Sequence, residues 1–162
     1  MTCKTTDDGR ALVVSIALCQ SAGVVGAFFT RSAIPDWYVT LTKPAFTLPA
    51  WVFAPVWIVL YALMGIAAFL VWRKGFHHRT VRGALFIFAG QLMLNAAWPV
   101  LFFGLRSIEA ALVEILLLWI AVCSTVMRFF RVSRQAGWLL VPYLLWTSYA
   151  ALLNVFFWIM NS

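Results

Sequence analysis

The chain has 162 residues, of which 64% are apolar and 10% are charged, and its net charge is +7. A soluble domain needs a charged surface that this composition cannot supply. The basic residues lie in short clusters between apolar runs, a pattern that indicates membrane topology and argues against a nucleic-acid-binding surface. We expect one transmembrane domain that covers residues 1–162.

Five apolar intervals with few charges are long enough to cross a bilayer. A helix needs about 20 apolar residues to span the hydrocarbon core. The predicted spans are residues 11–29, 51–72, 83–103, 110–129 and 138–160. They lack the alternation of membrane strands, and so few strands do not close a known type of barrel. The sequence therefore predicts an all-α fold, an integral membrane bundle of five transmembrane helices.

The first span is longer than the apolar part of a cleaved signal peptide, which usually has about 7–15 residues, so we expect a retained helix. Its small residues repeat at the spacing that lets two helix backbones approach closely. We predict that this stripe forms a homodimer contact, with Ala89 and Ala96 of the third span as the next candidates. The stripe consists of Cys19, Gly23 and Ala27, with Ala22 and Gly26 beside them.

The connection between the first two spans, about residues 30–50, is long for so small a protein, and such loops are usually functional. We call it loop one. Its prolines stiffen it, and aromatic residues flank them. We predict that loop one closes over a cavity as a lid, with Trp37, Pro44 and Trp51 as lid residues.

Aromatic rings and amides share faces on three predicted helices. By helical rise they lie roughly 8–15 Å below the same end of the bundle. Lipid cannot satisfy an amide, so the amides are expected to face the bundle. A single amide more often joins helices, but three amides among large rings favour a pocket. The shared faces are Trp57 and Tyr61; Gln91, Asn95, Trp98 and Phe102; and Trp146, Ala150 and Asn154.

Two further features bear on this face and on chemistry. Pro99 removes a backbone N–H inside the third span, which predicts a kink or a freed carbonyl there. Glu114 lies about one turn inside the fourth span and is either a structural hydrogen-bonding group or a functional one. The sequence has no nucleotide-binding loop, catalytic triad or metal-ligand spacing, so we expect no catalytic residue and no metal site.

The basic residues also predict the orientation in the membrane. With five spans, one side of the membrane receives nine basic residues and the other receives Arg31, Lys43 and Arg106. Basic residues concentrate on the cytoplasmic side, so the N-terminus is predicted to lie inside the cell. The nine are Lys4, Arg10, Arg73, Lys74, Arg79, Arg82, Arg128, Arg131 and Arg134.

These motifs resemble those of the translocator protein, or tryptophan-rich sensory protein (TspO/MBR), family. They extend from loop one through the last span, nearly the whole chain. They are W-Y-x-x-L-x-K-P at Trp37–Pro44, W-V-F-A-P-V-W at Trp51–Trp57, G-Q-L-x-L-N-x-A-W-P-x-x-F-F-G at Gly90–Gly104, A-L-V-E at Ala111–Glu114, and P-Y-L-x-W with L-N at Pro142–Trp146 and Leu153–Asn154.

The resemblance implies a five-helix bundle, usually a homodimer, that binds porphyrins and haem-like tetrapyrroles. Some members of the family also bind sterols or aromatic drug-like ligands. Bacterial relatives are linked to tetrapyrrole-dependent regulation and to light-driven porphyrin breakdown involving the tryptophans matched here by Trp57 and Trp146. By motif match, the ligand-binding residues are Tyr38, Trp57, Tyr61, Asn95, Trp98, Trp146 and Ala150.

The chain departs from the family pattern in two places. The loop motif K-P-x-W-x-P-P has lost one Trp and one Pro in residues 43–49. The sterol motif of animal members needs Tyr and Arg after the Leu-Asn pair, where this chain has Val155 and Ile159. Sterol recognition through that motif is therefore not implied, and such motifs are weak evidence in any case.

Two functions remain after these observations. The first is a membrane receptor, carrier or sensor that binds porphyrin or haem as its ligand and needs no obligatory cofactor. Apart from light-dependent porphyrin degradation, we do not expect it to be an enzyme. The alternative is a small solute- or proton-coupled transporter that uses Glu114. The expected location is the bacterial cytoplasmic membrane.

Overall fold

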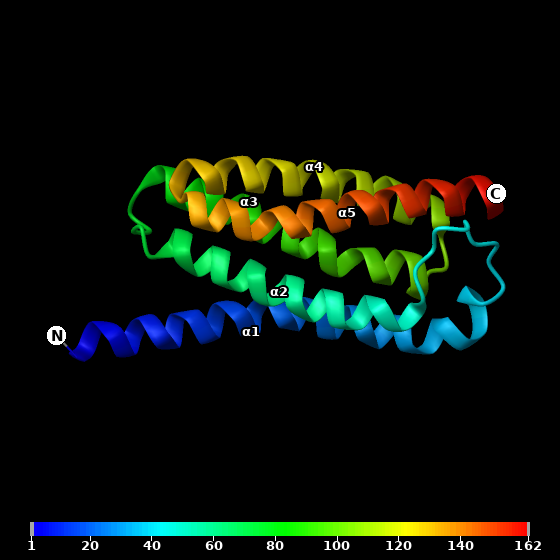
Figure 1. Cartoon of the computed structure of the whole chain (residues 1–162), viewed down its shortest axis with the longest axis horizontal. Helices are drawn as coiled ribbons and strands as arrows, with labels where there is room; N and C mark the ends of the chain where they lie inside the picture. Colours follow the sequence, from blue (N-terminus) through cyan, green and yellow to red (C-terminus); the bar gives the residue numbers. More distant parts are fainter. Residues whose placement is uncertain (1, 162) are drawn as a thin grey trace.

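The computed structural model describes the backbone of residues 2–161 and the side chains of residues 8–161 other than Ser32. Five long helices lie side by side in an elongated bundle, and two of them extend into short π-helical turns (Figure 1). Apolar runs of this length form helices in a membrane because helices satisfy every backbone polar group internally. The elements are α1 (Thr2–Ala33), η1 (Ile34–Tyr38), α2 (Ala50–Trp72), α3 (Arg79–Pro99), η2 (Val100–Gly104), α4 (Ile108–Val132) and α5 (Arg134–Asn161).

All five helices are long and apolar enough to cross a membrane, so the protein is an integral membrane protein. Each predicted span lies inside the corresponding helical segment, which confirms the predicted five-helix bundle. These segments are Asp8–Arg31, Ala50–Trp72, Arg79–Gly104, Ile108–Val132 and Arg134–Asn161.

The two ends of the bundle differ in charge and in covering. Loop one, the α3–α4 connection and the C-terminus lie at one end, which we call the loop-one end (Figure 1). The N-terminus and the α2–α3 and α4–α5 connections lie at the other, the N-terminal end. Most of the exposed basic residues gather there, as the charge count predicts, whereas Arg31, Lys43 and Arg106 are exposed towards the loop-one end. Those at the N-terminal end include Arg73, Lys74, Arg79, Arg82, Arg128, Arg131 and Arg134.

Loop one is shorter than its predicted range of about residues 30–50. The helical conformation of α1 continues through η1 to Tyr38, so the irregular connection covers only residues 39–49. Pro35 lies in the first turn of η1, where the helix changes from α to π, and the wider turn accommodates the donor that proline removes.

The irregularity predicted at Pro99 takes the form of a π-helical turn. Directly after Pro99 the hydrogen bonding changes, and the Leu105 N–H donates to the Val100 carbonyl at 2.8 Å. A wider turn accommodates the donor that proline removes. Phe102 and Phe103 lie in this turn, and both rings contact Trp98.

Cys19, Ala22 and Gly26 are buried and Gly23 is partly buried inside the chain, whereas Ala27 is exposed, so most of the predicted stripe is occupied and the homodimer contact there stays a prediction. A Cβ on Gly23 would lie 2.6 Å from the Tyr61 ring, and one on Gly26 would lie 3.1 Å from Pro99. The small residues let α1 approach α2 and α3 closely. Large apolar side chains cover the opposite face of α1, where Phe28 is 77% exposed.

Candidate functional site

A chain of four buried polar side chains crosses the middle of the bundle. The Tyr61 hydroxyl of α2 donates to the Asn95 amide oxygen of α3. The Asn95 amide nitrogen donates to the Tyr143 hydroxyl of α5 at 2.8 Å, and that hydroxyl donates to the Gln91 amide oxygen at 2.8 Å. Gln91, Asn95 and Asn154 are all buried, which confirms that the amides face the bundle. The network holds three helices in register.

Aromatic rings lie against this network. Trp57 stacks on Tyr61 with ring centroids 5.3 Å apart and an interplanar angle of 29°. The same indole meets the edge of Tyr143 at 6.3 Å. Residues 57 and 61 share a face because they are one helical turn apart. Side chains of α2, α3 and α5 thus form one continuous polar and aromatic surface inside the bundle.

A second group of rings lies beneath loop one. Trp98 stacks on Phe102 with centroids 5.0 Å apart and an interplanar angle of 17°. Trp37 meets Phe102 at 5.3 Å, and Tyr38 meets Phe103 at 5.9 Å. Trp98 packs against both groups, so the two adjoin. The structure therefore places Tyr38 with the η2 rings and not beside Trp57.

The remaining candidate residues come from α5. Trp146 lies 5.6 Å from Phe53 of α2 and 5.5 Å from Tyr149, by ring centroids. Ala150, one turn further along, packs against the first group as a small, partly buried residue. These contacts bring the α5 residues to the same end of the bundle as the rings of α2 and α3.

Several buried polar atoms at this site have no hydrogen-bond partner within the part of the chain that the structure describes. They are the indole nitrogens of Trp98 and Trp146 and the amide oxygen of Asn154. A buried N–H or carbonyl without a partner is costly in an apolar medium, which makes these atoms available to a ligand with polar edges. The Gln91 amide nitrogen is also unpartnered, deeper in the bundle.

Loop one is held over this end by side chains of α5. The Asn161 amide binds the backbone of Thr42 twice, accepting from its N–H at 2.8 Å and donating to its carbonyl at 3.0 Å. The Tyr149 hydroxyl accepts from the Leu48 N–H at 3.2 Å and donates to the Phe46 carbonyl at 3.1 Å. Loop one is therefore a fastened cover.

The predicted lid residues take different places in this cover. Pro44 is buried, and Trp37 packs inward on Phe102. Trp51 lies in the first turn of α2 and is 75% exposed, so the structure does not bring it into the site. Lys43 sits 4.6 Å above the Tyr38 ring as a cation at the rim. Burial raises the pKa of the Tyr38 hydroxyl, which keeps it a hydrogen-bond donor.

Sequence reasoning missed two residues of this site. Tyr143 joins the polar network to the rings, and Phe53 contacts Trp146. Both carried a usable signal, because Tyr143 precedes Trp146 by three residues and Phe53 precedes Trp57 by four, which places each pair on one helix face.

The candidate rings contact one another, so a flat ligand has to displace at least one of them.

Glu114 is the second notable feature of the interior. This α4 side chain is 6% exposed, and neither of its carboxyl oxygens has a hydrogen-bond partner among the described residues. Among the described residues, no group of three His, Cys, Asp or Glu side chains is placed to hold a metal ion. His77 and His78 are exposed in the α2–α3 connection at the opposite end from the rings.

Comparisons with known proteins agree with this architecture. The model of the TspO/MBR family matches residues 15–159. The chain is 44% identical over 143 residues to the tryptophan-rich protein TspO of Chlorobaculum tepidum, covering 88% of this chain and 90% of that relative. It is 42% identical over 138 residues to the translocator protein of Bos taurus, covering 84% and 81%.

A third relative is the tryptophan-rich sensory protein of Cereibacter sphaeroides, which is 35% identical over 147 residues, covering 91% of this chain and 89% of the relative. These names describe translocator and sensory proteins and not enzymes. The matched region contains the polar network, the rings and loop one with its Tyr149 fastening, whereas Asn161 lies just beyond it. The chain therefore belongs to the TspO/MBR family.

Proposed function

We propose that this protein binds porphyrin or haem-type tetrapyrroles in the Trp-rich site beneath loop one, as a membrane receptor, carrier or sensor. One observation carries the proposal: large rings and unpartnered buried indole N–H groups gather under a fastened cover. The names of the relatives, sensory protein and translocator protein, support a role in sensing or moving a ligand.

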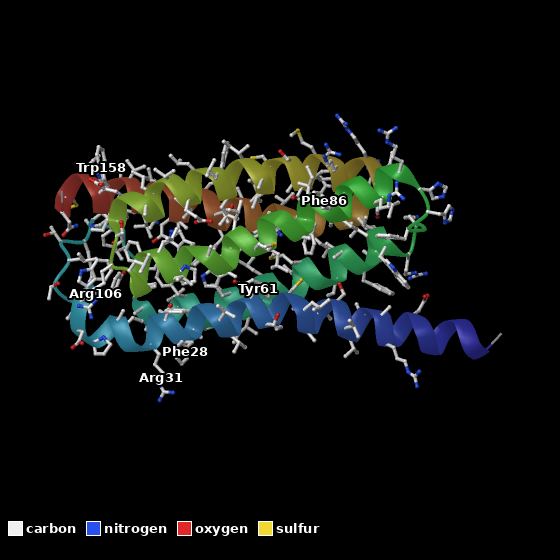
Figure 2. The ribbon with its side chains drawn as sticks, turned by 180° about the vertical axis from the view of Figure 1, so that it is seen from behind. Phe28, Arg31, Tyr61, Phe86, Arg106 and Trp158 are labelled. Carbon is white, nitrogen blue, oxygen red and sulfur yellow. The ribbon has the colours of Figure 1, made fainter. Side chains whose placement is uncertain are left out.

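The chemistry of the site suits a flat ligand with polar edges. Indole faces stack on such a ring, each good stack contributing about 0.5–1.5 kcal/mol beyond burial. The Trp98 and Trp146 N–H groups are available donors, and the Tyr38 hydroxyl adds a further hydrogen-bonding group under loop one. Lys43 at the rim is placed to meet a propionate, whereas Arg31 points away from the bundle (Figure 2). Light-dependent breakdown of the bound porphyrin is part of the same proposal.

Titration with protoporphyrin IX tests this function. Purified protein is titrated in detergent while its tryptophan fluorescence is followed. A ring stacked against the site quenches that fluorescence, so we expect quenching that saturates at a defined ratio of ligand to protein. Quenching that grows without saturation would indicate partition into apolar surface and would refute the proposal.

Weakening the fastening of loop one should speed ligand exchange. Asn161→Ala removes both hydrogen bonds to the Thr42 backbone. Each is worth about 0.5–1.5 kcal/mol, together about 1–3 kcal/mol, so loop opening becomes at least about fivefold more frequent. The association and dissociation rates of protoporphyrin both rise. Stopped-flow fluorescence measures these rates.

A matched control for this change lies outside loop one. Gln20→Ala also removes an exposed amide that binds backbone, the Ile58 carbonyl of α2 at 2.9 Å. It should leave the exchange rates unchanged. Equal rates in the Asn161 variant and the unmodified protein would show that loop one does not limit entry.

We also propose the assembly and the location that follow from this reading. The protein forms a homodimer in a bacterial cytoplasmic membrane, with its N-terminus inside. Most of the α1 stripe is occupied within the chain, which makes the α3 surface of Ala89 and Ala96 the next candidate contact. Ala89 is exposed there and Ala96 is partly buried.

The alternative function, a solute- or proton-coupled transporter, rests on Glu114. A buried carboxyl without a partner is typical of proton relays in membrane proteins. If the alternative holds, Glu114→Gln abolishes uptake driven by a pH gradient in proteoliposomes but leaves protoporphyrin titration intact. If Glu114 is structural, the variant loses thermal stability and shows no specific transport defect.

A further inference from the structure

The first turn of α3 carries two arginines whose charge is not balanced within the described structure. Arg79 and Arg82 both lie in this turn, which contains no acidic residue. The helix dipole is positive at this end and disfavours cations there. Among the described side chains, the one ion pair joins Arg73 to Asp8 at 3.5 Å. Arg79 and Arg82 therefore lack a carboxylate partner among these residues.

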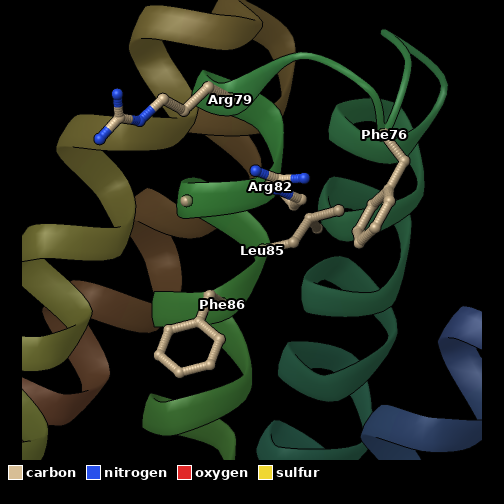
Figure 3. A pocket seen from close by; sticks show the side chains of 6 residues that line it. Phe76, Arg79, Arg82, Leu85 and Phe86 are labelled. Carbon is tan, nitrogen blue, oxygen red and sulfur yellow. The ribbon is translucent and has the colours of Figure 1, made fainter.

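These two arginines lie at the head of a groove. A cavity of about 610 Å³ is lined by the α2–α3 connection and the first turns of α3, and Figure 3 shows the side chains around it. In Figure 3 Leu85 points towards the Phe76 ring, Arg82 lies above Leu85 on α3, and Arg79 extends to the side away from Phe76. Phe86, one turn after Arg82, is 82% exposed. The lining residues are Phe76, Arg79, Arg82, Gly83, Leu85 and Phe86.

The groove thus changes from basic to apolar along α3 in the direction of the membrane interior. Arg79 begins the helix, and the transmembrane segment includes every later lining residue. A molecule that fills such a groove needs an anionic head near the water boundary and an apolar tail beside Leu85 and Phe86. Arginine binds phosphate oxygens with two parallel hydrogen bonds, and basic pockets at membrane surfaces bind anionic lipid headgroups.

We propose that this groove binds one anionic phospholipid from the leaflet at the N-terminal end. Arg79 and Arg82 hold its phosphate, and an acyl chain runs along Leu85 and Phe86. The site lies at the end of the bundle opposite the rings beneath loop one, so it is independent of tetrapyrrole binding.

Membrane topology alone explains why arginines gather at this end, but it does not require a groove between them. Arg134 serves as the comparison for Arg79 and Arg82. It is exposed at the same end, at the start of α5, and does not line the cavity. General attraction to an anionic surface would act on Arg134 as strongly as on Arg79 and Arg82. A specific site in the groove would instead depend on Arg79 and Arg82 and not on Arg134.

Native mass spectrometry of the full chain in detergent tests the proposal. The protein is titrated with phosphatidylglycerol and, separately, with phosphatidylcholine of the same acyl chains. We expect one phosphatidylglycerol to bind in preference. The double variant Arg79→Gln/Arg82→Gln should raise its Kd about tenfold, and Arg134→Gln should change it less than about twofold.

A second variant tests the groove without changing any charge. Gly83 lines the cavity, and a Cβ there meets only the end of the Arg128 side chain at 3.4 Å. Gly83→Leu therefore fills the groove and leaves both arginines in place. We expect it to weaken phosphatidylglycerol binding several-fold, with an unchanged elution volume and a melting temperature no lower than that of the unmodified protein as evidence of folding.

Four results would overturn the proposal. They are equal binding of the two lipids, equal losses in the Arg134 variant and the double variant, an unaffected Gly83→Leu variant, and competition by millimolar inorganic phosphate. The last result would assign the arginines to a free anion. None of these results bears on the protoporphyrin titration, so the two proposals fail separately.

Discussion

Replacing Trp57 or Trp146 by Phe is expected to weaken protoporphyrin binding, whereas replacing Trp72 by Phe is expected to leave it unchanged. Trp57 stacks on Tyr61, and Trp146 contacts Phe53, at the site beneath loop one. A phenyl ring retains the apolar character of the indole but offers less area for stacking. A lost stack of about 0.5–1.5 kcal/mol corresponds to roughly 2–12-fold in Kd.

Trp72 is the matched control for these two variants. It ends α2 at the opposite end of the bundle, partly exposed, and stacks on Phe69 at 6.3 Å. It therefore has the same chemistry and an aromatic neighbour but lies outside the proposed site. Titration by fluorescence gives the Kd of each variant, and illumination of the complex gives the rate of porphyrin loss.

The pattern of the three variants decides the location of the ligand. Small, similar effects in all three would indicate a sticky apolar surface. A loss confined to Trp72→Phe would place the ligand at the N-terminal end, where Trp72 lines a cavity of about 340 Å³. Either pattern would remove the proposed site and leave only the five-helix bundle.

Gly65→Leu is expected to separate α1 from α2 and to lower the stability of the bundle. A Cβ on Gly65 would lie 2.6 Å from the Cα atom of Ile16 and 2.9 Å from its backbone nitrogen. A backbone cannot rotate out of the way as a side chain can, so the two helices must move apart. The hydrogen bond from the Ser15 hydroxyl to the Gly65 carbonyl, at 2.8 Å, is then lost as well.

The net effect depends on two opposing terms. Leucine favours the helical conformation over glycine by roughly 1 kcal/mol, whereas overpacking typically costs about 1–3 kcal/mol and more where backbone is in the way. We therefore expect a net loss and a lower melting temperature in detergent, measured by circular dichroism.

Gly83→Leu serves as the control for this change. Its Cβ meets only a flexible guanidinium, so the same substitution gains helix propensity without a clash. It should melt at or slightly above the temperature of the unmodified protein. A Gly65 variant as stable as the Gly83 variant would show that α1 is not packed against α2 as described.

The sequence by itself determined the number of spans, their type and the faces that point inwards. Apolar runs without charges have one stable form in a bilayer, the helix, so their length set the five spans. Amides have no partner in lipid, so Gln91, Asn95 and Asn154 had to face the bundle. Helical spacing also predicted that Trp57 and Tyr61 share a face, and they stack.

Only the tertiary structure decided which helix each face meets. The small-residue stripe of α1 suited any close partner, and the structure shows that Tyr61 and Pro99 of the same chain occupy it. Which rings lie inside also depended on neighbouring helices, so Tyr143 became central to the network while Trp51 points outwards. Spacing along one helix defines a face, but the partner of that face is set by packing between segments that are distant in the sequence.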